Sequence, residues 1–112
     1  MAHLEICHGD GSIEQVTLFK RLSVIGTGDG VDITLKDASC MGVMAYVSQS
    51  GTTYILSVPQ DKPAAISRGL PVRKMELNDQ QKFSLGTTTF TYRTSEIEEP
   101  APLPQNEEQS EL

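Results

Sequence analysis

Apolar and polar residues alternate over short stretches through most of the first 94 residues, and no stretch repeats at the spacing of a long amphipathic helix. Val, Ile, Thr and Tyr, which favour strands, recur in these stretches. In residues 3–7 the alternation predicts that Leu4 and Ile6 point inward. The same pattern predicts strands at residues 3–7, 13–19, 22–25, 32–35, 43–48, 52–58, 75–77, 82–85 and 87–93.

Turn signals separate these predicted strands. Asp10-Gly11 is typical of a hairpin turn, and three glycines within residues 26–30 predict a loop, because glycine tolerates positive φ. A second loop is predicted at residues 36–42, and residues 59–71, with three prolines, are predicted to form a long loop with room for one short strand. About ten or eleven short strands joined by tight turns predict an all-β fold, a β-sandwich of two sheets.

Composition narrows the class of protein. A chain of 112 residues suits one domain. Its apolar runs are far shorter than the ~20 residues of a membrane span, and its first residues lack the basic and apolar segments of a secretory signal. Cys7 and Cys40 are too few for a disulfide framework, so we expect reduced thiols in a cytoplasmic protein.

The charge is concentrated at the C-terminal end. The net charge is −6, but residues 1–94 hold nine acidic and nine basic residues and are neutral. Without a basic surface we expect no nucleic-acid partner. Residues 95–112 carry six glutamates, three prolines and no lysine or arginine. This composition predicts a domain at residues 1–94 followed by a disordered acidic, Pro-rich tail or linker at residues 95–112.

Several segments form an ordered series of landmarks. Residues 22–26 read LSVIG, residues 31–37 read VDITLKD, residues 45–47 read AYV, residues 68–72 read RGLPV, and residues 90–92 read FTY. In this order the segments resemble the forkhead-associated (FHA) domain, and the resemblance covers most of residues 2–93. It implies an FHA-like β-sandwich of about 10–11 short strands in two sheets. In this family the fold recognises phosphothreonine peptides.

The positions that grip phosphate in the family are changed here. The resemblance places Thr27 where the family has arginine, Met41 where a serine bonds the phosphate, and Gly42 where a second arginine follows. Three further positions depart from the family's histidine, its Asn-Gly asparagine and its Gly-Asp pair: Met44, Arg68 and Gln80-Gln81. Arginine and hydroxyl donors supply the charge-assisted bonds of such a site. The chain therefore resembles a degenerate FHA domain, and a phosphothreonine partner is not expected.

The resemblance also implies a binding face made of loops 26–31, 38–43 and 60–70. On it we predict partner-binding positions at Thr27, Met41, Gly42, Arg68 and Gly69, with apolar contact from Met41 and a directional polar contact from Arg68. Two alternatives stay open. Met44 could fill the core instead of contacting a partner, and Lys62 with Arg68 and Thr27 could form a rebuilt phosphate site.

No other motif predicts chemistry. The glycines of residues 26–30 do not match a dinucleotide fingerprint and lie between two predicted strands. Histidine occurs only at His3 and His8, in the first predicted hairpin, so no catalytic arrangement or zinc site can be built on spacing. We expect no enzymatic activity, no cofactor and no metal.

These observations predict a non-enzymatic protein–protein interaction module in bacterial signalling or assembly that acts independently of phosphothreonine. Three alternatives remain: a phosphopeptide reader with a rebuilt site, the cytoplasmic domain of a type III secretion inner-membrane ring protein, and an accessory domain fused to a catalytic domain. The partner and the oligomeric state are not encoded in any motif.

Overall fold

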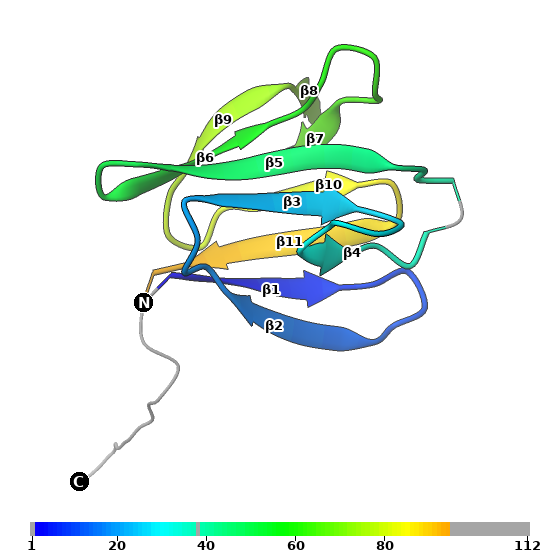
Figure 1. Ribbon diagram of the computed structural model, residues 1–112, viewed down its shortest axis with the longest axis horizontal. Helices are drawn as coiled ribbons and strands as arrows, with labels where there is room; N and C mark the ends of the chain where they lie inside the picture. Colours follow the sequence, from blue (N-terminus) through cyan, green and yellow to red (C-terminus); the bar gives the residue numbers. More distant parts are fainter. Residues whose placement is uncertain (1, 38, 95–112) are drawn as a thin grey trace, which may run out of the picture.

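The computed structural model describes residues 2–37 and 39–94. The predicted tail at residues 95–112 lies outside the described residues. The described chain forms eleven strands and no helix, arranged as two packed sheets (Figure 1). The predicted all-β sandwich is therefore confirmed. Among the described residues, no helix is long and apolar enough to span a membrane.

One sheet has six strands and carries both ends of the described chain. Its strands are, in spatial order, β2 (Ile13–Thr17), β1 (His3–Cys7), β11 (Thr88–Arg93), β10 (Lys82–Leu85), β7 (Ala65–Ser67) and β8 (Leu70–Val72). The first and last strands pair antiparallel along the whole of β1, with Leu4 opposite Tyr92 and Ile6 opposite Phe90. This pairing closes the sandwich between residues far apart in the sequence.

The other sheet has five strands and carries the long central hairpin. Its strands are, in spatial order, β4 (Ile33–Thr34), β3 (Leu22–Gly26), β5 (Val43–Ser50), β6 (Thr53–Ser57) and β9 (Lys74–Leu77). Only β3 and β4 pair in parallel; the other neighbours are antiparallel.

The core lies between the sheets and follows the alternation of the sequence. Leu4 and Ile6 are fully buried, as predicted, and Phe83 stacks on Phe90 with ring centroids 4.8 Å apart. Tyr54 lies against Tyr92 at the edge of this core. The two sheets thus share one apolar layer, which holds the loops at either end in fixed positions.

Residues 59–71 differ from the prediction. The segment contains β7 and the start of β8, which pair as a tight hairpin, where one short strand at most was expected. Pro71 lies inside β8 because β8 is an edge strand, where a missing N–H leaves no sheet hydrogen bond unmade. The proline that suggested a loop is therefore compatible with a strand.

Strand direction decides which loops lie together. β3 ends where β5 begins, with Gly26 paired to Val43, and β6 ends where β9 begins, with Ser57 paired to Lys74. We call this side, at the right of Figure 1, the loop end; it gathers residues 8–12, 27–31, 35–37, 39–42, 58–64, 73 and 86–87. The opposite side, which we call the turn end, gathers residues 18–21, 51–52, 68–69 and 78–81.

The hairpin between β7 and β8 turns on Arg68 and Gly69. Both have positive φ, at 56° and 78°. A two-residue turn with positive φ at both positions is type I′, which favours Asn-Gly. Arginine has a Cβ that crowds the following carbonyl in this conformation, whereas asparagine adopts it more readily. The turn therefore holds a local strain that the rest of the hairpin imposes.

This strain gives a stability prediction. Arg68→Asn should raise the free energy of unfolding by about 1 kcal/mol, because asparagine relieves the left-handed conformation. Urea denaturation measures the change. Arg21→Asn is the matched control, since Arg21 is also exposed but does not have positive φ. Equal effects of the two substitutions would mean that the gain comes from charge or composition instead of the turn.

Candidate functional site

The loop end is built on a close approach between β3 and the loop before β5. A Cβ added at Gly26 would lie 2.2 Å from the carbonyl oxygen of Gly42, so only glycine fits there. Thr27 N donates to Gly42 O, and Gly42 N donates to Thr27 Oγ1, each at 2.9 Å. Gly42 itself has φ of 72°. The two loops that the sequence predicted to form one face are locked together by this reciprocal pair.

Asp37 ties the same loop to the other sheet. Its carboxylate accepts hydrogen bonds from Ser39 N and Oγ and from Thr87 N and Oγ1, over 2.7–3.0 Å. These bonds, led by the Ser39 hydroxyl and followed by the backbone N–H groups, hold the pKa of the Asp37 carboxyl well below its usual range. A Cβ at Gly86 would lie 2.2 Å from this carboxylate, so the β10–β11 turn also needs glycine.

Lys62 brings the third loop to the site. Its Nζ donates to Met41 O at 3.0 Å and lies 3.8 Å from the position of a Cβ on Gly42. Arg73 fixes this loop from beneath, because its Nη1 donates to Pro59 O at 2.8 Å and to Lys62 O at 2.7 Å. The Nζ of Lys62 is therefore held by the Met41 carbonyl, and its main chain by bonds to Arg73 and Pro59.

Met41 is the most prominent apolar group of this surface. Its side chain is 73% exposed, whereas Met44, three residues later, is buried in the core at 3%. The alternative that Met44 fills the core is thus confirmed. Of the four aspartates in segments 27–32, 35–37 and 58–64, Asp32 is paired with Lys20, and Asp37 is bonded to Ser39 and Thr87. The other two, Asp29 and Asp61, are matched in number by Lys36 and Lys62. The exposed thioether of Met41 therefore suits apolar contact on a surface whose charges are balanced.

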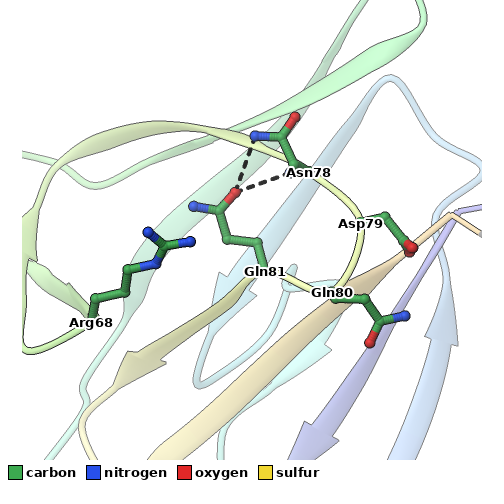
Figure 2. A pocket seen from close by; sticks show the side chains of 5 residues that line it. All are labelled: Arg68, Asn78, Asp79, Gln80 and Gln81. Atoms are coloured by element: carbon green, nitrogen blue, oxygen red, sulfur yellow. Dashed lines mark hydrogen bonds between the residues drawn. The ribbon is translucent and has the colours of Figure 1, made fainter.

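Arg68 and Gly69 lie elsewhere. Thr27, Met41 and Gly42 come together at the loop end, but the β7–β8 turn lies at the turn end, so the prediction of one face carrying all five residues is wrong. Figure 2 shows Arg68 beside the β9–β10 turn, with its guanidinium directed toward Gln81. Together they line an open pocket of about 490 Å³ whose walls are Arg68, Asn78, Asp79, Gln80 and Gln81.

A signal for this correction was present in the sequence. Two strands separated by two residues, the second of them glycine, are typical of a hairpin. If residues 68–69 are the turn of a hairpin, the chain must first cross the sandwich along β7 before it reaches them. The turn then lies at the opposite end from loop 58–64. Lys62, which no motif marked as a main site residue, then becomes the cation of the loop end nearest Gly42.

The acidic, histidine and cysteine side chains were compared with the arrangement that a metal ion needs. In the described ranges 2–37 and 39–94, no group of three His, Cys, Asp or Glu side chains is arranged to hold a metal ion. His8 Nε2 lies 2.6 Å from Glu14 Oε1, within the first hairpin. This contact belongs to the β1–β2 hairpin and involves none of the loop-end residues described above.

Comparison with solved structures identifies the fold. The chain resembles the FHA domain of the CT664 protein from Chlamydia trachomatis, with a TM-score of 0.70, 20% identity, and coverage of 85% of this chain and 98% of that one. It resembles the yeast Dun1 FHA domain, solved with a doubly phosphorylated peptide, with a TM-score of 0.67, 13% identity, and coverage of 97% and 88%. The described chain therefore has an FHA-like β-sandwich fold.

A similar structure also comes from a secretion system. The cytoplasmic domain of the type III secretion sorting platform protein PscD from P. aeruginosa matches with a TM-score of 0.73 and 16% identity, covering 96% of this chain and 92% of that one. At the level of sequence, no protein-family model matches the chain, and no curated protein matches it. The similarity is thus one of three-dimensional structure.

The Asp37 network gives a pH prediction. A depressed folded-state pKa contributes stability that is present above the ordinary pKa of 3.8 and is lost as pH falls through the folded-state value. Asp37→Asn should therefore lower the free energy of unfolding at neutral pH, and its difference from the parent should shrink below about pH 4. Denaturation followed from neutral to acidic pH tests this. Asp61→Asn, at an exposed position without a side-chain bond in the described chain, is the control.

Proposed function

We propose that this chain is a non-enzymatic protein–protein interaction module whose loop end binds its partner independently of phosphothreonine. The observation that carries the proposal is the chemistry of the loop end: an exposed Met41 lies on a loop whose backbone is bonded to Lys62 and Thr27. Loops held by a rigid sandwich are where recognition residues are usually placed. The partner is a protein, and bacterial signalling or assembly in the cytoplasm is the setting that fits these features.

The donors at the loop end are poorly arranged for a phosphate dianion. Thr27 Oγ1 accepts a hydrogen bond from Gly42 N and can offer a phosphate one O–H donor, which is neutral. Lys62 Nζ is engaged with Met41 O. A phosphate brought here would lose its water and meet one lysine without any arginine fork, and loss of hydration without charge-assisted bonds costs kilocalories.

Met41 offers a different type of contact. A methionine side chain adapts to irregular apolar surfaces, and here its backbone is held from two sides. Its carbonyl accepts from Lys62, and the next residue, Gly42, is paired with Thr27. The exposed thioether can therefore be buried by a partner without reorganising the loop, which lowers the entropic cost of binding.

Two alternatives have observations in their favour. Lys62 lies beside Gly42, as a rebuilt phosphopeptide site would need, although Arg68 lies too far away to join it. The similarity to the cytoplasmic domain of PscD favours a role in assembly of a type III secretion platform. The Dun1 domain, solved with its phosphorylated peptide, represents the first alternative.

Phosphopeptide titration separates the main proposal from the rebuilt site. We expect phosphothreonine peptide libraries to bind no tighter than about 1 mM, which corresponds to about −4 kcal/mol. Amide chemical shifts at the loop end report binding, and the same library without phosphate is the control. Saturable micromolar binding that requires phosphate and is lost in Lys62→Met would establish the rebuilt site instead.

A pair of single variants tests the location of the partner surface. Met41→Asp should weaken partner binding by about 2 kcal/mol or more, the scale of a central interface residue. Arg68→Glu introduces an acid at the turn end and should leave the affinity within about 0.5 kcal/mol of the parent. Calorimetry with a partner identified by proximity labelling measures both. A partner that binds Met41→Asp as tightly as the parent would place the interface away from the loop end.

A further inference from the structure

The edges of the two sheets differ in how well they are protected from pairing with another strand. β8 has three residues and contains Pro71, and β4 has only two residues. β9 carries exposed charges at Lys74 and Glu76. Short length, proline and charge are the usual means of blocking an edge. β2, at the lower margin of Figure 1, is an edge strand of the six-stranded sheet. It has five residues, no proline and one acidic residue.

The hydrogen bonds at the two ends of the β1–β2 pair show which N–H and C=O groups of β2 point away from β1. His8 N donates to Ser12 O at 2.8 Å, and Leu18 N donates to Ala2 O at 2.9 Å. Antiparallel pairs alternate between bonded and non-bonded, so the register places Glu14 and Val16 in the bonded pairs with β1. The N–H and C=O groups of Ile13, Gln15 and Thr17 therefore point away from β1. No hydrogen bond within the described ranges uses them.

We propose that β2 pairs antiparallel with β2 of a second copy of this chain, across a two-fold axis at Gln15. In this register Gln15 faces its counterpart, and Ile13 faces Thr17 of the second copy on either side. All three are outward-facing residues, so each of the three pairs exchanges two backbone hydrogen bonds. The six-stranded sheets of the two copies would then continue into one another.

The side chains of β2 complement each other in this register. Ile13, which is 64% exposed, meets the β-branched Thr17 of the other copy, and two Gln15 amides meet at the axis. Neither pair brings like charges together, and isoleucine and threonine both favour strands. Glu14 meets Val16 of the other copy, and its carboxylate is already held by His8 of its own chain at 2.6 Å. No two like charges face each other.

Other two-fold registers are worse. An axis at Glu14 would set two carboxylates opposite each other, which is destabilising. An axis at Val16 leaves only two outward-facing pairs, because Ile13 then loses its opposite residue within β2. The occupant that best fits this edge is thus a second copy of the chain, since the strand is complementary to itself.

Sedimentation of the 112-residue chain tests the proposal. Between about 1 μM and 1 mM the parent should show a reversible monomer–dimer equilibrium. Gln15→Pro removes an outward N–H that the monomer does not use, and Gln15→Lys places two cations at the axis. Each should raise the dissociation constant at least about tenfold. Gln49→Lys adds the same charge at an exposed position of β5, which belongs to the other sheet, and should leave the dissociation constant unchanged.

Circular dichroism of each variant is the control that tests whether the sandwich is folded. If Gln15→Pro proves unfolded, Gln15→Lys carries the comparison. The proposal is overturned if the parent stays monomeric at the highest concentration, if the dimer persists in Gln15→Lys, or if Gln49→Lys dissociates it equally. A monomeric parent whose β2 amides become protected from exchange only when a different protein is added would show that the edge takes another partner.

Discussion

The loop end depends on one steric constraint: the backbone of β3 and the backbone before β5 approach so closely at Gly26 and Gly42 that no side chain fits between them. That approach lets Thr27 and Gly42 exchange hydrogen bonds through the backbone and one hydroxyl. The loops are then shaped without any ligand. The side chains that project from them, Met41 above all, can differ from those of a phosphate-binding surface while the scaffold beneath stays the same.

Asp37 also shapes the loop end without a ligand. Asp37 gathers four donors from its own loop and from the β10–β11 turn, and so joins the two sheets at this end. A carboxylate that is satisfied internally orders the loop in the unbound protein. For the proposed binding at the loop end, these bonds reduce the ordering that a partner has to impose.

The alternation of the sequence predicted the strands and the inward residues well. Successive side chains of a strand point to opposite faces, so each buried position, such as Leu4 and Ile6, is marked by its own apolar residue. It could not predict which end of the sandwich a turn occupies. That depends on the number of chain reversals, and one hairpin hidden by Pro71 moved Arg68 to the opposite end. The position of Lys62 likewise depends on Arg73, through bonds to backbone carbonyls that leave no trace in the sequence.

The proposed loop-end interface and the proposed β2 pairing have a joint geometric consequence. β2 begins at the loop end and runs toward the turn end. Antiparallel pairing of two copies reverses this direction, so their loop ends would point to opposite sides of the joined sheet. Two partner sites facing away from each other cannot grip one compact partner together. Such a dimer would link two separate partners, and its gain in avidity would arise only where those partners are themselves held in an array.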